Sequence, residues 1–478
     1  MFLKKEHWSV FVIFLITLLG FYLRFHNYTV QTSWFDEWHS LFVADPGITY
    51  ENLFSRYHGN EENYFLPEHY PPLYILVLRS FFNLFGYSDD VGRIFSLIFG
   101  TASLPLVAYL SYQINSSKSY VFSCLITSLN IFLIWQSLEI RAHSFLVFNA
   151  LLNLIIFFKI YDTSYKKNFL LLSYFISSLF LLSLWPITLA IFFSKLIFIL
   201  FEYLKKNKIK NFNLFILINI ILLFYIIINY RYLFYQVSRD WHYTLLYKTF
   251  FYNFHFRTFF GSIELGAVYL IIFFILIISS VKTFFLNTNA KLNLILLIIL
   301  SSYFLTLTYS LLRAPVMSPK YVIFILPLII IWISIRLDQI KIKKIFWIKS
   351  ILVCVTIVNV FVLINKNPIE RPPVKDALKI IAESNIKLLF SNESNVFNNY
   401  LKINKIFKDS KLVLIDKNSS LKTEKKIWFI CLNNPRFALG NIGSTLPDDK
   451  KCIPNNKDLL LIKEVRLPDL ILRQYKIN

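Results

Sequence analysis

The chain has 478 residues, of which 56% are hydrophobic and only 16% are charged. Roughly a quarter of the residues of a soluble protein are charged, so this composition excludes an ordinary soluble globular protein. The formal net charge is +22, but the lysines and arginines lie in short clusters between apolar blocks and form no continuous basic stripe. This pattern argues against nucleic-acid binding and is typical of the cytoplasmic loops of a membrane protein.

Apolar segments of about 20 residues recur along the chain, and this length matches a hydrocarbon core of roughly 30 Å. Lys4 and Lys5 precede the first segment, and no small-residue cleavage site follows it. We therefore expect a retained first helix and a cytoplasmic N-terminus. About 11 transmembrane helices are predicted, at residues 8–25, 91–113, 119–137, 142–161, 168–184, 187–204, 211–230, 264–282, 291–312, 319–336 and 345–364. They predict an all-α polytopic membrane protein.

The distribution of lysine predicts the orientation of the chain in the membrane. No lysine occurs between Lys5 and Lys118, so residues 26–90 are expected to form a loop on the outer face. The later lysine clusters fall in every second connection between the predicted helices, as expected if those connections are cytoplasmic loops. Within the outer loop, residues 71–86 are apolar, but a crossing there would place every later cluster outside. We expect a helix that starts after two prolines and lies in the outer leaflet, with a short crossing as the alternative.

The polar tail at residues 365–478 differs from the apolar part at residues 1–364. One helix-like stretch (374–383) is followed by short apolar runs, which predict a small α/β domain. The strand-like runs are 386–390, 412–415, 427–432 and 459–465. An odd number of crossings would make this domain extracytoplasmic. Cys431 and Cys452 would then face an oxidising compartment, where a disulfide can form, although spacing alone does not establish the pair.

An acidic pair, Asp36 and Glu37, opens an amphipathic stretch in the outer loop. Ser33 lies three residues before Asp36, which is a spacing typical of a helix cap, and acidic residues suit a helix N-terminus. The alternative interpretation is functional, with a carboxylate held at the membrane surface by an amphipathic helix. Spacing alone does not separate the two.

Basic residues occur at two further sites on the predicted outer face. Glu139, Arg141 and His143 lie at a corner between two helices, and Lys320 with Tyr321 lies in a short loop after Arg313. A guanidinium group offers planar, permanently charged donors to phosphate oxygens, so this pattern indicates a phosphate site. The structural alternative is an arginine that reaches to lipid headgroups.

Lys195 lies near the middle of the predicted span 187–204. A cation within the membrane indicates function by default, with a lysine that reaches a nearby polar cavity as the alternative. The histidines of the outer loop, His39, His58 and His69, could join the acidic pair in a metal site. No tight ligand spacing such as HExxH occurs, which disfavours this interpretation.

Taken in order, these motifs resemble the GT-C glycosyltransferases. The sequences WFDE at 34–37, HYPPLY at 69–74 and LFG at 84–86, followed by Arg93, look like the first outer loop of that superfamily. EIRAHS at 139–144 and PKY at 319–321, with Pro327, look like later parts of the same pattern. The most similar branch contains protein O-mannosyltransferases, lipid A aminoarabinose transferases and RgtA/B/C/D-like enzymes. The resemblance covers roughly residues 8–330 and rests on the order of the motifs.

The resemblance implies inverting transfer of a sugar from a polyprenyl phosphate to a lipid, glycan or protein on the outer face of the plasma membrane. It implies no required cofactor, with a divalent metal as an open alternative. Asp36 is the expected general base, with Glu37 as its neighbour. The other implied site residues are Arg141, Lys320, Arg93 and Lys195 for the donor phosphate, and His69, Glu139, His143 and Tyr321 for the substrates. His143 departs from the aromatic residue usual in the family, and Lys320 replaces an arginine.

Two other classes of membrane protein are alternatives. A transporter or flippase is expected to show internal repeats and helices broken by glycine or proline, whereas this chain has ten glycines and no visible repeat. An O-antigen ligase or polymerase shares the lipid-linked donor, but its outer loop lies late in the chain. The early acidic loop therefore favours the GT-C interpretation and leaves the sugar and the acceptor open.

Overall fold

The computed structural model divides the chain into two compact units, and each is described by itself. The first comprises residues 1–26, 55–77 and 95–366, and the second comprises residues 27–54, 78–94 and 367–478. The structure describes residues 2–26, 33, 35–58, 71–115, 119–162, 168–204, 212–230, 255, 257–285, 289–312, 317–340, 345–364, 373–384, 386, 388–391, 394–403, 413–414, 426–432, 459–468 and 470–477.

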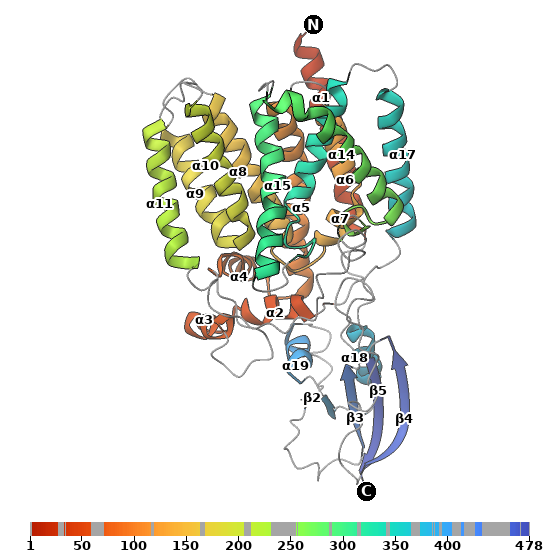
Figure 1. Ribbon diagram of the computed structural model, residues 1–478. Coiled ribbons are helices and arrows are strands. Elements are labelled where there is room, and N and C mark those ends of the chain that lie inside the picture. Colours follow the sequence, from red (N-terminus) through yellow and green to blue (C-terminus); the bar gives the residue numbers. More distant parts are fainter. Residues whose placement is uncertain are drawn as a thin grey trace. The chain divides into compact units, whose positions relative to one another are not determined.

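The first unit is a bundle of long apolar helices that run side by side (Figure 1). Helices α8 to α11 lie together on one side of the bundle, and α1 and α17 lie on the other. The helices are α1 (Phe2–Phe25), α6 (Ser119–Ser128), α7 (Ile131–Gln136), α8 (His143–Asp162), α9 (Asn168–Leu184), α10 (Leu189–Leu204), α11 (Phe212–Tyr230), α13 (Arg257–Phe260), α14 (Ile263–Phe285), α15 (Ala290–Leu312), α16 (Ile325–Gln339) and α17 (Ile345–Leu363). The short helix η1 (Pro186–Thr188) precedes α10, and most of α5 (Asp89–Ile114) also belongs here.

Six of the described helices are long and apolar enough to cross a membrane: α1, α5, α8, α15, α17 and the combined η1 and α10. They satisfy their backbone hydrogen bonds internally, which the hydrocarbon core of a bilayer demands. Large apolar side chains such as Phe304 (71% exposed) and Phe361 (75% exposed) point out of the bundle, as expected for lipid-facing positions. The protein is therefore an integral membrane protein, and the count of about 11 spans remains a prediction.

The predicted single span 119–137 is wrong, because the helix breaks at residues 129–130. Helix α6 ends at Ser128 and α7 begins at Ile131, with the Asn130 side chain accepting a hydrogen bond from the backbone of Leu133 at 3.0 Å. The Asn130 amide also donates to the carbonyl of Phe259 at 2.8 Å. Side chains thus replace the backbone bonds that the break removes, and this allows non-helical backbone within the protein.

The predicted span 319–336 also begins too early. Residues 319–324 form turns, and α16 starts at Ile325. Pro327 lies in the first turn of α16, where a backbone N–H would have no partner within the helix, so proline is tolerated there. If the helix had started at residue 319, the proline ring would have collided with the carbonyl of Ile323.

The apolar segment 71–86 forms α4 (Leu73–Phe85), which starts directly after the two prolines and ends at Gly86 with a positive φ of 97°. Its 13 residues give a length of about 20 Å, shorter than the roughly 30 Å core of a bilayer. The length favours the predicted helix in the outer leaflet over a crossing.

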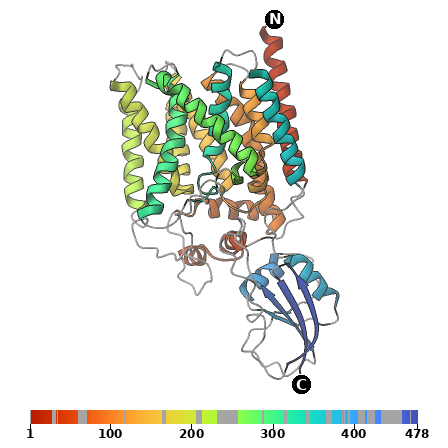
Figure 2. The same ribbon diagram turned by 45° about the vertical axis from the view of Figure 1, so that its right-hand side comes forward.

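The second unit contains a five-stranded mixed sheet in the order β2-β1-β3-β5-β4. Its elements are α2 (Phe35–Val43), part of α3 (Tyr50–His58), the second part of α4, the start of α5, α18 (Val374–Glu383), β1 (Leu388–Ser391), α19 (Ser394–Ile403), β2 (Val413–Leu414), β3 (Lys426–Leu432), β4 (Leu459–Leu467) and β5 (Leu470–Ile477). Strand β1 pairs in parallel with β2 and β3, and β5 pairs antiparallel with β3 and β4. Figure 2 shows α18 and α19 beside this sheet.

The core of the sheet is apolar and includes Ile427, Phe429 and Cys431 of β3, packed with Ile471 and Tyr475 of β5. Cys431 is disulfide-bonded, whereas Cys124 and Cys354 are free thiols. Cys452, the other cysteine of the tail, lies outside the described residues. Helix α18 has the bounds predicted from sequence, and α19 and β5 were not predicted.

Candidate active site

The first candidate group of residues lies on α2 in the second unit. Asp36 and Glu37 occupy the first turn of this helix, where acidic side chains face the positive end of the helix dipole. Their surroundings differ, because Asp36 is partly exposed whereas Glu37 is fully buried. Of these two acidic residues, Asp36 is therefore the more exposed. Trp34, part of the same motif, lies outside the described residues.

A buried arginine holds the first turn of α2 in place. Arg93 Nε lies 3.9 Å from Glu37 Oε1, and both side chains are 0% exposed. Arg93 Nη2 also donates to the hydroxyl of Ser33 at 3.2 Å. The Ser33 hydroxyl thus accepts a hydrogen bond from Arg93. Arg93 was predicted to bind the donor phosphate, but in this structure it contacts carboxylates of its own unit.

Two residues that sequence reasoning missed extend this group. Asp89, the first residue of α5, lies 3.9 Å from Arg93 Nη1 through its Oδ2 atom. The same oxygen lies 2.9 Å from the ammonium of Lys375 on α18. No sequence pattern marked Lys375, which is one of many lysines in the polar tail. We call Glu37, Arg93, Asp89 and Lys375 the ion-pair chain.

An aromatic contact lies beside the ion-pair chain. The ring centroids of Trp38 on α2 and Tyr400 on α19 are 4.5 Å apart, and both rings are buried. Burial raises the pKa of Tyr400 well above its usual value, and the nearby carboxylate of Asp89 raises it further. The Tyr400 hydroxyl therefore stays protonated at physiological pH and cannot act as a base.

The second candidate group of residues lies in the first unit, at the corner between α7 and α8. Glu139 is fully buried, and one of its carboxylate oxygens lies 3.7 Å from His143 Nδ1 and 3.7 Å from Lys320 Nζ. The backbone of this corner is also held, because Ser96 donates to the Glu139 carbonyl at 2.5 Å. The structure thus brings together three residues from two distant motifs.

Aromatic side chains border this group. The Trp185 ring lies 6.2 Å from the His143 ring and 5.3 Å from the Tyr321 ring. Arg141 is half-buried, in contrast to the buried Lys320. We call Glu139, Arg141, His143, Lys320 and Tyr321 the corner cluster, and its cations meet the chemical requirements of a phosphate site.

Lys195 does not belong to the corner cluster. Its ammonium donates to Asn153 Oδ1 at 2.7 Å and lies 4.5 Å from the centre of the Tyr174 ring. The Asn153 amide in turn donates to Ser177 and Ser178, each at 2.9 Å. Asn153 follows His143 by ten residues on α8, which corresponds to about 15 Å along the helix. Neutral groups surround this lysine deep in the bundle.

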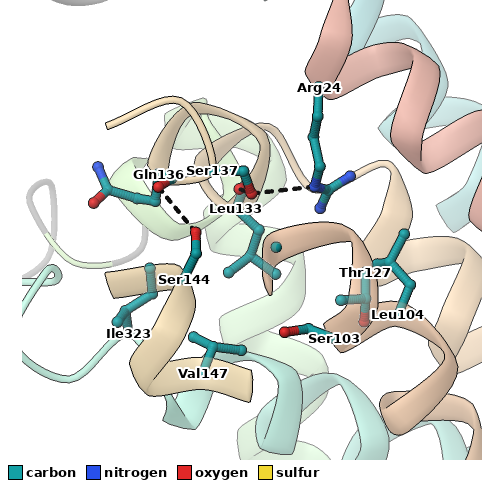
Figure 3. A pocket seen from close by; sticks show the side chains of 11 residues that line it. Arg24, Ser103, Leu104, Thr127, Leu133, Gln136, Ser137, Ser144, Val147 and Ile323 are labelled. Carbon is teal, nitrogen blue, oxygen red and sulfur yellow. Dashed lines mark hydrogen bonds between the residues drawn. The ribbon is translucent and has the colours of Figure 1, made fainter. Parts of the chain in front are cut away.

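Arg24 is a further buried cation that sequence reasoning missed. It donates to Ser137 Oγ at 3.2 Å, to the Ser128 carbonyl at 3.2 Å and to the Gly20 carbonyl at 2.9 Å. Figure 3 shows Arg24 reaching toward Ser137 beside a small pocket, with Ser144 bonded to the Gln136 carbonyl. Arg24 caps the end of α6 and holds the backbone that leads into the corner cluster.

Two predicted positions cannot be placed, because His69 and Arg313 lie outside the described residues. His39 is buried on α2. Within the parts of the chain that the structure describes, no group of three or more histidine, cysteine or acidic side chains is arranged to hold a metal ion.

No family model and no curated protein matches this sequence. Two crystal structures of ArnT from Cupriavidus metallidurans nevertheless match almost the whole chain. The apo form superposes with a TM-score of 0.57 and the form bound to undecaprenyl phosphate with a TM-score of 0.52. Each match covers 98% of both chains at 9% sequence identity. The chain therefore shares the fold of these ArnT structures. This agrees with the fold that the motif resemblance implied, and at this identity the comparison concerns the fold alone.

Proposed function

We propose that the protein is an inverting glycosyltransferase that moves a sugar from a polyprenyl phosphate to a lipid, glycan or protein acceptor. The observation that carries the proposal is the match of 98% of the chain to the fold of ArnT, one of whose structures holds undecaprenyl phosphate. A transporter has no reason to share this fold over its whole length, so the comparison favours the enzyme.

Asp36 is the proposed general base. As the acceptor oxygen attacks the anomeric carbon, its proton passes to the Asp36 carboxylate, and the bond from that carbon to the phosphate oxygen breaks. Attack from the face opposite the phosphate inverts the configuration. The partial exposure of Asp36 supports this role. Glu37 is buried against Arg93, and we assign it to the support of the helix rather than to proton transfer.

The corner cluster is the proposed binding site of the donor phosphate. The leaving polyprenyl phosphate takes the electron pair of the broken bond, so cations that face its oxygens stabilise the transition state. Arg141 is the better candidate for direct contact, because it is half-buried and its guanidinium can form two parallel hydrogen bonds. Lys320 would add charge, while Glu139, His143 and Tyr321 would contact the substrates. The neutral surroundings of Lys195 and the carboxylate contacts of Arg93 favour structural roles for both.

We further propose that the N-terminus is cytoplasmic and that the tail after residue 364 is an extracytoplasmic α/β domain. The disulfide at Cys431 supports this orientation, because disulfides persist in oxidising compartments outside the cytoplasm. A reporter enzyme that functions only in the cytoplasm should be inactive when fused to the C-terminus. Activity of that fusion would contradict the orientation.

The test of the function is Asp36→Asn in the purified protein, assayed with polyprenyl-phosphate pentoses and hexoses. Asp36 lies in the first turn of α2, so asparagine loses only the interaction of the charge with the helix dipole, typically about 0.3–1 kcal/mol, but it cannot accept the proton. Loss of a general base typically lowers the rate about 10²–10⁴-fold. A matched control is Asp376→Asn, because Asp376 is an exposed acid in the first turn of α18. Near-normal sugar transfer by Asp36→Asn would show that Asp36 is not the general base.

A further inference from the structure

The ion-pair chain connects the tail of the protein to the helix that carries the proposed base. Lys375 lies near the start of α18, and its ammonium approaches both Asp89 Oδ2 (2.9 Å) and Asp90 Oδ1 (3.8 Å). Asp89 also approaches Arg93, which in turn contacts Glu37 and Ser33. All of these residues belong to the second unit. The contacts form an unbroken series from α18 to the first turn of α2.

The balance of charge in this chain depends on Lys375. Glu37 and Asp89 are 0% and 2% exposed, and Arg93 is 0% exposed. Arg93 lies 3.9 Å from both carboxylates, and Lys375 lies 2.9 Å from that of Asp89. Without Lys375, Asp89 would lose its nearer cation and would compete with Glu37 for Arg93, which leaves a buried negative charge with poorer compensation. Such a charge is costly in a buried site, so the side chains would rearrange.

A second contact from the tail reaches the same helix. Tyr400 of α19 packs on Trp38 of α2, with 4.5 Å between the ring centroids and 56° between the ring planes. Trp38 follows Glu37 directly, so the polar and the aromatic contact hold neighbouring residues of one helical turn. Helix α19 therefore contacts α2 directly, whereas α18 reaches α2 through Asp89 and Arg93 of α5.

We propose that Lys375 is a positioning residue, which holds the proposed base Asp36 in place through Asp89, Arg93 and Glu37. The proposal rests on the assignment of Asp36 as the base. Lys375 itself touches no substrate. Its ammonium neutralises Asp89, which leaves Arg93 available to Glu37, and the Arg93–Glu37 pair fixes the turn that carries Asp36. The tail thereby contributes a residue that positions the proposed base of the active site.

The test compares Lys375→Ala with Lys375→Arg in the full-length protein. Lys379→Ala is the matched control, because Lys379 lies one turn further along the same helix and is exposed. Hydrogen exchange of the backbone amides reports the order of α2 without any need for activity. In Lys375→Ala we expect exchange in residues 35–43 to be at least about tenfold faster than in wild type. Exchange in β3 should be unchanged, and Lys375→Arg should restore the wild-type rate in α2.

The kinetic consequence follows from the same variants. Misplacement of a catalytic group by about 1 Å can lower the rate about 100-fold, so we expect Lys375→Ala to lower kcat roughly 10- to 100-fold. The KM for the polyprenyl-phosphate sugar should change less than about twofold, because Lys375 makes no contact with the donor. Lys375→Arg should retain most of the activity.

The outcomes separate this inference from the proposed function. Unchanged exchange of α2 in Lys375→Ala would overturn the positioning role, whatever the kinetics show. Faster exchange throughout the second unit, including β3, would also overturn it, because Lys375 would then stabilise the whole unit. If Asp36→Asn transfers sugar normally, the assignment of the base fails instead, and the exchange data still report whether Lys375 orders α2.

Discussion

Lys320 and Lys195 are both almost fully buried in the helix bundle, but their neighbours differ. Lys320 lies 3.7 Å from the carboxylate of Glu139, next to a histidine and two aromatic rings. Lys195 contacts the side-chain oxygen of Asn153 and the face of Tyr174, and no described carboxylate pairs with it.

The two lysines differ in what compensates their charge, and we expect this difference, rather than burial alone, to determine which of them can contribute to a phosphate site. At Lys320 a carboxylate compensates the charge, and the half-buried Arg141 lies in the same cluster. At Lys195 an amide, two hydroxyl groups and an aromatic ring form a closed set of contacts, which stabilise the packing of α8, α9 and α10. The three predictions below test this difference.

The largest effect is expected for Glu139→Gln. This change removes the carboxylate that Lys320 and His143 approach and leaves a buried ammonium with poorer compensation. Breaking a buried ion pair in this way typically costs about 3–5 kcal/mol, so the melting temperature of the purified protein should fall strongly. The double variant Glu139→Gln with Lys320→Met should recover much of this loss, because both charges are then absent. A melting temperature equal to that of the wild type in the single variant would show that the pair does not stabilise the corner.

The second effect concerns binding of a polyprenyl phosphate, measured by titration of the purified protein. A hydrogen bond to a charged group contributes about 1.5–3 kcal/mol, so Arg141→Ala should weaken binding about 10- to 100-fold. Arg141→Lys should lose less, because it keeps the charge without the planar donor pair. Arg257→Ala, a change at an exposed arginine of the same unit, is the control. Unchanged binding by Arg141→Ala would return Lys195 and Arg93 to consideration.

The smallest effect is expected for Lys195→Met. Methionine keeps most of the apolar length of the side chain and removes a buried charge. The lost hydrogen bond from the charged ammonium to Asn153 costs about 1.5–3 kcal/mol, but the removal of a buried charge offsets part of this cost. Sugar transfer should therefore stay within about twofold of wild type, and the melting temperature should change little. A large loss of phosphate binding by this variant would reverse the distinction between the two lysines.

The apolar blocks predicted the helices of the bundle because helix length and burial depend on local sequence. The bounds of α18 were also predicted, since Pro373 precedes a clearly amphipathic stretch. The break at residues 129–130 was missed, because its stability depends on Arg24 and Phe259, which are distant in sequence. Asn130 was the available signal, as asparagine is a common helix cap. Strand β5 was missed because Arg473 and Gln474 interrupt its apolar residues, whereas β3 contains a continuous apolar run.

For the candidate site, the order of the motifs indicated which residues belong together at the corner cluster. Glu139, His143, Lys320 and Tyr321 were named from sequence and lie in one group of contacts. Lys195 was grouped with them only because it is a cation, and hydropathy does not reveal which helix a lysine faces. Asp89 and Lys375 were not named, because a pair so distant in sequence has no local pattern.

The break between α6 and α7 has a consequence for biosynthesis. Its two external partners lie on opposite sides of it in the chain, Arg24 being 104 residues before Ser128 and Phe259 being 129 residues after Asn130. Arg24 is therefore already in the membrane when Ser128 leaves the ribosome. At about 5–20 residues per second, Phe259 follows Asn130 only after roughly 10 s. During that interval the Asn130 amide has no access to its final acceptor, so this corner of the protein is completed in two stages separated by the synthesis of α8 to α11.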